Sequence, residues 1–202
     1  MGRTGERGSL SYLGGKEREE CRARPPLKEI QTARLLLRPF RETDLDDLYE
    51  FLSQLRDDEF EGYPGVTRES AGEHLRERIG SGNYYAVQLA DTGKVIGHIS
   101  RIPRDFGAVE VGFIMGERFR RRGYALEALA AVMENAFAEG AHRVYAECDP
   151  RNVPSWMLLE KAGFQREARF RQNIWFRRDE AGKPVWKDTF VYAVLESDLP
   201  PR

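Results

Sequence analysis

The spacing of hydrophobic positions changes several times along the chain, and each spacing predicts an element. Apolar residues recur every three or four positions, as in a helix with one buried face, over residues 45–55, 68–79 and 125–137. Shorter apolar or alternating runs are typical of strands and occupy residues 35–40, 84–89, 95–102, 109–115, 144–148, 165–177 and 185–195. A further helix is predicted to run from Asn152 to Gly163. This mixed order is not the regular alternation of a doubly wound sheet, and it predicts an α+β fold.

Polar residues at the ends of these segments indicate caps and turns. Thr67 is predicted to cap the second helix, whose buried face would hold Ala71, Leu75 and Ile79. Residues 91–94 and 179–184 have the composition of hairpin loops.

Composition places the chain in a broad class. The 202 residues, 41% of them hydrophobic, suffice for one domain with a real core, and the 32% of charged residues predict a soluble protein. We expect residues 1–29 to form a disordered polar tail and residues 30–199 to form the domain. The chain has no apolar run long enough for a membrane span and no signal-peptide core, which predicts a cytoplasmic protein without membrane contact. Its two cysteines and three histidines are scattered, so no disulfide or metal site is predicted.

The segment that follows the strand at 109–115 has the features of an anion site. Four arginines lie between residues 118 and 122, and Gly123 then precedes the start of a helix. Unpaired N–H groups and the helix dipole place positive charge at such a start, and glycine lets a ligand approach the backbone closely. A solvated basic face or a nucleic-acid patch would have a similar composition. The net charge of −1 argues against a nucleic-acid partner and favours a small anionic ligand.

Two motifs carry a resemblance to a known family. Arg120-x-x-Gly123-x-Ala125 resembles the (Q/R)-x-x-G-x-(G/A) signature of the GNAT superfamily of N-acetyltransferases. Asn152-x-x-Ser155, followed by Lys161-Ala-Gly-Phe, resembles the second cofactor motif of the same family. The resemblance covers residues 30–199 and is strongest to the ribosomal-protein-alanine-acetyltransferase-like branch. It implies a central mixed, mostly antiparallel sheet with helices on both faces, and acetyl-CoA as co-substrate without a metal.

The resemblance also assigns roles to individual positions. It implies that the backbone around the basic turn binds the pyrophosphate of acetyl-CoA, through Arg120, Arg121, Arg122, Gly123, Tyr124 and Ala125. It implies that the strand backbone at Phe113, Ile114 and Met115 pairs with the pantetheine arm and polarises the thioester. Asn152 would bind the same arm, Ser155 would donate a proton to the departing sulfur, and Lys161 would reach phosphate.

Glu110 and Ser155 are the candidate catalytic residues. Glu110 lies on a strand of apolar residues and resembles a family glutamate. Apolar surroundings make a carboxylate a better proton acceptor near neutral pH. Glu110 is equally well interpreted as a surface residue paired with an arginine. Asn152 and Ser155 also match ordinary helix capping, with Pro154 in the first turn. Cys148 has no histidine nearby in sequence and is not predicted to be a nucleophile.

The sequence leaves three functional interpretations. The first is an N-acetyltransferase in which the amine attacks acetyl-CoA directly in a ternary complex. The second is a CoA-binding sensor of the same fold, and the third is an interaction domain that uses the arginine run. For the enzyme, the expected acceptor is a peptide α-amino group or a small amine. The acidic segment 57–61 would attract such a cationic group. The expected oligomeric state is a monomer or a homodimer.

Overall fold

The computed structural model describes residues 27–55, 60 and 65–199. Most of the predicted tail, and the acidic segment 57–61 apart from Phe60, lie outside the described residues.

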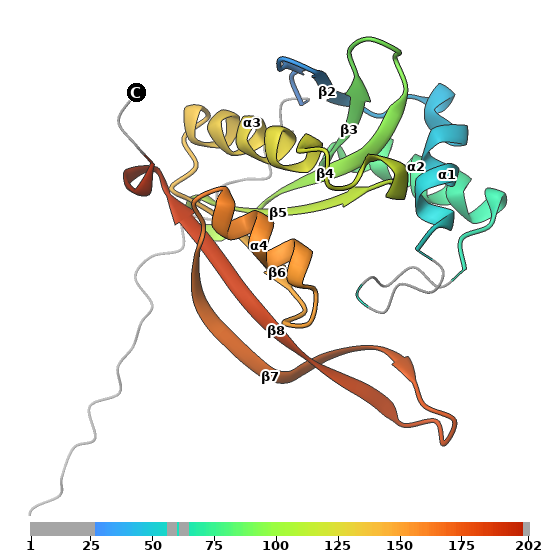
Figure 1. The fold of residues 1–202 in the computed structure, drawn as a ribbon, viewed down its shortest axis with the longest axis vertical. Coiled ribbons are helices and arrows are strands. Elements are labelled where there is room, and N and C mark those ends of the chain that lie inside the picture. Colours follow the sequence, from blue (N-terminus) through green and yellow to red (C-terminus); the bar gives the residue numbers. More distant parts are fainter. Residues whose placement is uncertain (1–26, 56–59, 61–64, 200–202) are drawn as a thin grey trace, which may run out of the picture.

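One sheet organises the described part of the chain (Figure 1). Its strands are β1 (Ile30–Gln31), β2 (Leu35–Pro39), β3 (Tyr84–Leu89), β4 (Val95–Pro103), β5 (Ala108–Met115), β6 (Arg143–Cys148), β7 (Gln165–Arg178) and β8 (Pro184–Leu195). They are arranged in the order β1-β2-β3-β4-β5-β6-β8-β7. Among the described strands, β5 and β6 form the only parallel pair. The predicted mixed, mostly antiparallel sheet is therefore confirmed.

Helices cover both faces of this sheet. They are α1 (Leu45–Ser53), α2 (Arg68–Ser81), α3 (Tyr124–Ala138) and α4 (Val153–Lys161). Short 3-10 turns precede α1 and α3, connect β4 to β5 and follow β8. Helices α3 and α4 pack on one face of the sheet, and α1 and α2 pack on the other (Figure 1). The elements agree with the sequence prediction, apart from β1 and the 3-10 turns, which the spacing did not indicate.

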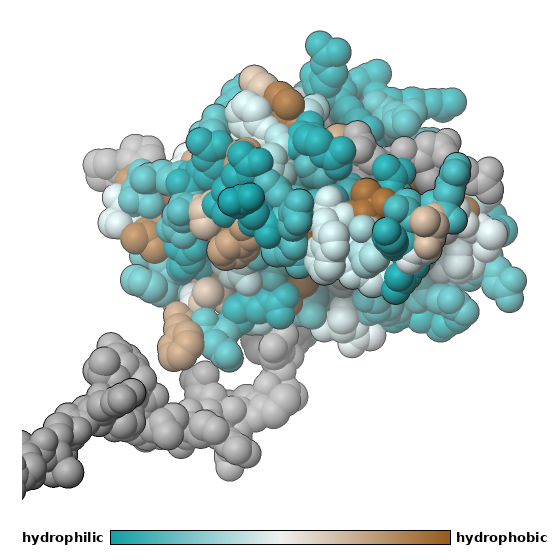
Figure 2. Space-filling view, turned by 90° about the horizontal axis from the view of Figure 1, so that it is seen from below, coloured by the Kyte–Doolittle hydropathy of each residue, from teal (hydrophilic) through white to brown (hydrophobic). Residues whose placement is uncertain are grey.

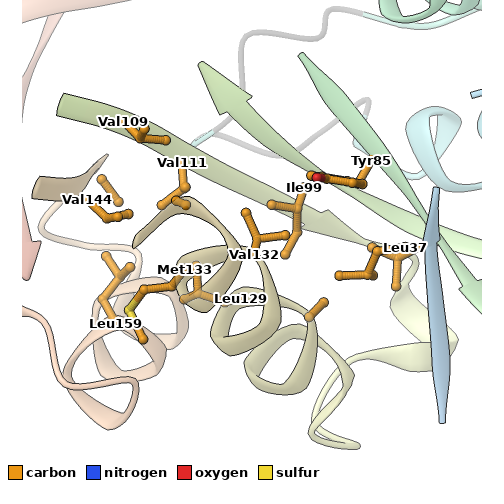
Figure 3. Packing of buried hydrophobic residues seen from close by; sticks show 14 of the residues in the cluster. Leu37, Tyr85, Ile99, Val109, Val111, Leu129, Val132, Met133, Val144 and Leu159 are labelled. Carbon is orange, nitrogen blue, oxygen red and sulfur yellow. The ribbon is translucent and has the colours of Figure 1, made fainter. Parts of the chain in front are cut away.

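Two hydrophobic cores hold the layers together. The larger one joins the sheet to α3 and α4. In Figure 3, Leu129, Val132 and Met133 of α3 lie beneath Ile99 and Val111 of the sheet. All five side chains are buried. Burial of each one stabilises the fold by roughly 1.5–3 kcal/mol.

The smaller core joins the opposite face of the sheet to α1 and α2, with Ile114 of β5 among its members. Here the predicted face of α2 is wrong at one position. Ile79 is 40% exposed, whereas Arg78 is 1% exposed and lies over the ring of Tyr84. The guanidinium also donates to the carbonyl of His74, at 3.0 Å, which satisfies part of its hydrogen-bonding need.

The parallel pair β5–β6 is short. Pairing covers Ala108 to Glu110 on β5 and Arg143 to Tyr145 on β6, and no pairing between the two strands follows within the described chain. From Val111 onward, β5 is hydrogen-bonded to β4 alone, and β6 continues with β8. Such a separation leaves backbone donors and acceptors of β5 available on one side.

The β7–β8 hairpin extends away from the body of the molecule (Figure 1). Figure 2 shows one face on which hydrophilic residues predominate and hydrophobic ones are scattered among them. Scattered apolar side chains of this kind are ordinary on protein surfaces. Within the described residues, no helix has the length and apolar character that a membrane span requires.

Candidate active site

The N-terminus of α3 presents a row of unpaired backbone donors. Within the described residues, the amides of 121–126 find no hydrogen-bond acceptor, and the first helical bond is donated by Glu127 to Gly123. The helix also has no side-chain cap. Arg121 and Gly123 have φ angles of 61° and 83°, so both lie in the left-handed region and turn successive N–H groups toward one side. The turn therefore fits the pyrophosphate group that the sequence motif implied.

Two residues of the loop between β1 and β2 hold this turn in place. Glu127 accepts hydrogen bonds from the Thr32 hydroxyl at 2.7 Å, the Arg34 amide at 2.9 Å and Arg34 Nε at 2.7 Å. Burial raises the pKa of Glu127, but these hydrogen bonds together outweigh it and hold the pKa below its ordinary value. The guanidinium of Arg34 also donates to the carbonyl of Arg122 and lies 4.5 Å from the ring centroid of Tyr124. These contacts could not be predicted from the sequence because the partners lie some 90 positions apart.

The side chains of the predicted turn residues differ in what they contact. Arg120 donates through Nε to the carbonyl of Met115 at 3.0 Å, so its side chain ties the turn to the end of β5. Arg121 and Arg122 are exposed, and Tyr124 and Ala125 are half-buried in the first turn of the helix. An exposed cation beside the unpaired amides adds to their attraction for phosphate.

A cavity of about 270 Å³ opens where β5 and β6 separate. Phe113 and Ile114 line it from β5, and Asn152 and Ser155 line it from the start of α4. These predicted residues, distant in sequence, are thus brought together. Met115 is buried in the larger core and does not line the cavity. Lys161 is also outside the wall, exposed at the far end of α4.

The start of α4 has the expected cap. Asn152 Oδ1 accepts from the amide of Ser155 at 3.3 Å, and Pro154 lies in the first turn. The Asn152 side-chain NH2 is not used by this bond. The Ser155 hydroxyl interacts with the Cys148 thiol, and burial, together with the charges of Asp149 and Glu147, raises the pKa of Cys148 to about 11 despite that interaction. Cys148 is therefore a neutral thiol near pH 7.

Glu110 lies at the end of the parallel pairing and not in the cavity wall. Its carboxylate accepts two hydrogen bonds from Arg104, at 2.8 and 2.5 Å, and one from the Tyr145 hydroxyl at 3.1 Å. The apolar surroundings that the strand pattern predicted for it are therefore not what the structure contains. The alternation along a strand predicts which face of the sheet a residue lies on. It does not predict which residues of the neighbouring strands and loops contact that residue.

Glu147 is a carboxylate that was not among the residues predicted for the site. It lies on β6 two residues after Tyr145, which pairs with Glu110, so both glutamates are on one face of the sheet. Glu147 lines the cavity. Desolvation, and then the charge of Glu110, raise the pKa of Glu147, although Arg104 lowers it. Its position five residues before Asn152, at the end of a strand, is the only signal that sequence offers for it.

An uncapped helix start after a basic turn, and a cavity between two separating strands of a mixed sheet, are the features that the sequence resemblance implied. The acetyltransferase (GNAT) domain model matches residues 34–165, and the chain belongs to this family. The family prediction is confirmed, and the chain is an N-acetyltransferase.

Two relatives match most of the chain. YnaD, an uncharacterized N-acetyltransferase of Bacillus subtilis, is 32% identical over 173 residues, which are 84% of this chain and 98% of YnaD. The [ribosomal protein uS5]-alanine N-acetyltransferase of Escherichia coli is 25% identical over 195 residues, 89% of this chain and 97% of that enzyme.

Solved structures have the same fold. A GNAT-family acetyltransferase from Bacillus anthracis matches with a TM-score of 0.76 and 28% identity, over 84% of this chain and 99% of that one. RimL, a ribosomal α-N-protein acetyltransferase in complex with coenzyme A, matches with a TM-score of 0.71 over 83% of this chain and 98% of that one. At 19% identity, this second likeness shows the fold alone.

Proposed function

We propose that the protein transfers the acetyl group of acetyl-CoA to a primary amine, by direct attack in a ternary complex. The observation that carries the proposal is the presence of two features that are unpaired within the described residues: the amides 121–126 and the edge of β5 beside the cavity. The first suits a pyrophosphate, and the second suits the amide groups of a pantetheine arm. One extended molecule of acetyl-CoA would satisfy both.

The chemistry then follows from the residues at the cavity. The strand backbone at Phe113–Met115 polarises the thioester carbonyl and stabilises the oxyanion as the amine attacks. A carboxylate takes the proton that the attacking amine loses. Collapse of the tetrahedral intermediate breaks the C–S bond, and Ser155, which lines the cavity, donates a proton to the departing sulfur. The serine regains a proton from solvent, and the carboxylic acid releases its proton to solvent. The products are the acetylated amine and CoA with a free thiol.

We propose that Glu147 is the general base and that Glu110 raises its basicity. Glu147 faces the cavity and receives the proton, and Glu110 lies behind it, held by Arg104 and Tyr145. The negative charge of Glu110 raises the pKa of Glu147, so it makes Glu147 a stronger base.

For the acceptor, we propose a peptide α-amino group or a small-molecule amine. The E. coli relative, by its name, acetylates an alanine of a ribosomal protein. An α-amino group has a pKa of about 7.7–8.0, against about 10.4 for a lysine side chain, so one carboxylate suffices to deprotonate it near neutral pH.

The test is thiol release from acetyl-CoA by the purified protein with a library of amines, with acetylated products identified by mass spectrometry. Peptides with free and with blocked N-termini, each carrying an internal lysine, separate α-amine from lysine acetylation. Absence of turnover with every amine, in protein that still binds acetyl-CoA, would support the CoA-binding sensor instead.

Variants of the two glutamates give a sharper result. We expect Glu147→Gln to lower kcat/KM by about 100-fold or more and to remove the acidic limb of its pH profile, because the base is lost. Glu110→Gln removes a negative charge, lowers the pKa of Glu147, and should therefore shift the acidic limb to lower pH with a smaller loss of rate. The opposite pattern, in which Glu110→Gln alone removes the limb, would make Glu110 the base.

A further inference from the structure

A buried histidine, His98 of β4, belongs to the wall of the cavity. The residue is 4% exposed, and its Nδ1 atom has no hydrogen-bond partner within the described residues. A buried polar atom without a partner costs free energy, and few such atoms remain in folded proteins. Because this side chain borders a cavity, a bound molecule can supply the missing hydrogen bond.

The imidazole of His98 is neutral near pH 7. Burial lowers its pKa well below the ordinary value, and the interactions with Arg78 and then His74 lower the pKa further. A neutral imidazole has one N–H donor and one acceptor nitrogen, so it binds an uncharged amide or hydroxyl group without a counter-charge. A half-turn of the ring exchanges each nitrogen with a carbon and leaves the outline of the ring almost the same, so either nitrogen can meet a ligand.

Two aromatic rings hold the imidazole in place. Its centroid lies 5.8 Å from that of Phe51 on α1 and 5.5 Å from that of Tyr84 on β3, with an interplanar angle of 88° to Tyr84. Packing from a helix and from a neighbouring strand restricts tilting of the ring. The hydrogen-bonding groups are therefore positioned before a ligand arrives, and less conformational freedom is lost when it binds.

His98 lies on the same face of the sheet as the proposed base. It pairs with Ile114 of β5, which follows Glu110 by four positions. Glu110 pairs with Tyr145 of β6, which precedes Glu147 by two positions. Because even separations along a strand keep side chains on one face, His98 and Glu147 share a face. Both line the cavity, which therefore offers a proton acceptor and a neutral hydrogen-bonding group.

The position of His98 favours the acceptor amine, rather than acetyl-CoA, as the molecule that contacts it. Its strand partner Ile114 belongs to the smaller core, on the face that α1 and α2 cover. The turn proposed to bind pyrophosphate begins α3, which packs on the opposite face. The pantetheine arm is proposed to pair with the edge of β5 that faces β6, whereas β4 pairs with the other edge. The amine, by contrast, has to reach Glu147, on the face of His98.

We propose that the imidazole of His98 forms a hydrogen bond with an uncharged polar group of the acceptor, so that this protein prefers amines that carry an amide or a hydroxyl group close to the amine. The inference rests on the proposed acetyl transfer and assigns a specificity-determining residue to it. A site with a buried hydrogen-bonding group discriminates against an analogue without the matching group, because the buried group then stays unpaired. A hydrocarbon amine would leave His98 in that state.

The experiment compares three acceptors of similar shape: alaninamide, alaninol and a branched hydrocarbon amine. Their amines differ in pKa, but this difference is the same for every protein variant and cancels when preferences are compared between variants. The preference for alaninamide or alaninol in kcat/KM should be about 10- to 100-fold higher in the wild type than in His98→Phe. Phenylalanine keeps a ring between Phe51 and Tyr84 and removes both nitrogens. The acceptor with the larger change identifies the bound group as amide or hydroxyl.

Two further variants serve as a partial replacement and a control. His98→Asn should keep part of the preference, because its side-chain amide has both a donor and an acceptor. His142→Phe removes an exposed imidazole outside the cavity wall and should keep the wild-type preference. A loss in His98→Phe that is equal for all three acceptors would show a purely structural role and overturn the proposal.

A second measurement uses the wild-type protein, in case substitution at a buried site impairs folding. The ring nitrogens of the three histidines can be followed by NMR after isotope labelling, and variants of His74 and His142 identify the signals of His98. Saturating N-acetylalaninamide, the expected product, should shift these signals in the presence of CoA, and the acetylated hydrocarbon amine should not. Unshifted signals, or equal shifts with both products, would overturn the role of His98 and leave acetyl transfer intact.

The two measurements also separate this inference from the proposed function. Absence of turnover with every acceptor would count against acetyl transfer. The NMR titration would still decide whether His98 binds an amide in the cavity.

Discussion

The helices α3 and α2 begin in opposite ways. At α2, Thr67 accepts a hydrogen bond from the Ser70 amide at 3.2 Å, and the Ser70 hydroxyl in turn accepts from the Thr67 amide at 2.9 Å. At α3, Gly123 stands in the capping position and no side chain accepts from the first turn. An ordinary cap contributes about 1 kcal/mol, so the start of α3 lacks a stabilising contribution that the start of α2 has. The start of α2 is thus satisfied by its own side chains, whereas the start of α3 is held by Thr32 and Arg34 and keeps its first amides unpaired within the described residues.

The start of α4 is intermediate between the two. Asn152 caps it through Oδ1, yet the same side chain lines the cavity and keeps its NH2 group available. We therefore expect the start of α2 to serve the fold alone and the start of α3 to serve ligand binding alone. The start of α4 should serve both. Substitutions at the three helices test this distinction.

The largest effect is expected at Gly123. Its φ angle is 83°, and a Cβ placed there would lie 3.3 Å from Arg34 Nη2. Gly123→Val should strain the turn by about 1–3 kcal/mol and redirect the amides, so binding of acetyl-CoA should be lost. In the wild type, the ligand at a hundredfold excess over Kd should stabilise the fold by about 2.7 kcal/mol. The melting temperature with and without acetyl-CoA measures both effects.

Gly82→Val is the matched control. Gly82 has a φ angle of 61°, ends α2 and has open space where a Cβ would be placed. This variant should be destabilised in a similar way and yet retain the full shift caused by acetyl-CoA. A retained shift in Gly123→Val would remove the turn from the binding site.

A smaller effect is expected at Ser155, which the start of α4 holds against the thiol of Cys148. Ser155→Ala should lower kcat by about tenfold and leave the Kd for acetyl-CoA nearly unchanged, since a donor to the departing sulfur acts in the transition state. Its amide, and not its hydroxyl, makes the capping bond, so stability should change little. If the rate stays at the wild-type level, Ser155 has no part in the chemistry.

The contrast between helix starts also explains what sequence could predict. Caps, glycine turns and helix faces depend on residues within a few positions, and Thr67, Asn152 and the basic turn were found on that basis. The prediction of the buried face of α2 was wrong at Ile79, because Arg78 is buried instead. Its contact with Tyr84 of β3 cannot be inferred from the helical spacing of hydrophobic residues.

Contacts between distant strands were not predictable. Whether Glu110 meets an apolar wall or Arg104 depends on how β4, β5 and β6 meet, and on where the last two separate. The same separation makes Glu147 a cavity residue. Lys187 reads in sequence as an ordinary charged position of a hairpin strand, and only the fold buries it. The family motifs selected the basic turn and the start of α4, whereas Glu147 is recognised as a cavity residue only in the structure.

The smallest and most discriminating effects are expected at Asn152. Thr67→Ala and Asn152→Ala should each lower stability by about 1 kcal/mol through loss of a cap. Only Asn152→Ala should also weaken acetyl-CoA binding, by several-fold, because its side chain lines the cavity.

Asn152→Asp separates the two roles. Aspartate is as good a cap as asparagine, so the melting temperature should stay near that of the wild type. The variant loses the two N–H donors of the amide and places a negative charge beside the pantetheine path, so acetyl-CoA affinity should fall at least as far as in Asn152→Ala. Calorimetric titration with acetyl-CoA and thermal unfolding measure the two quantities independently. Wild-type affinity in Asn152→Asp would reduce Asn152 to a cap, and the start of α4 would then resemble that of α2, with α3 alone binding the cofactor.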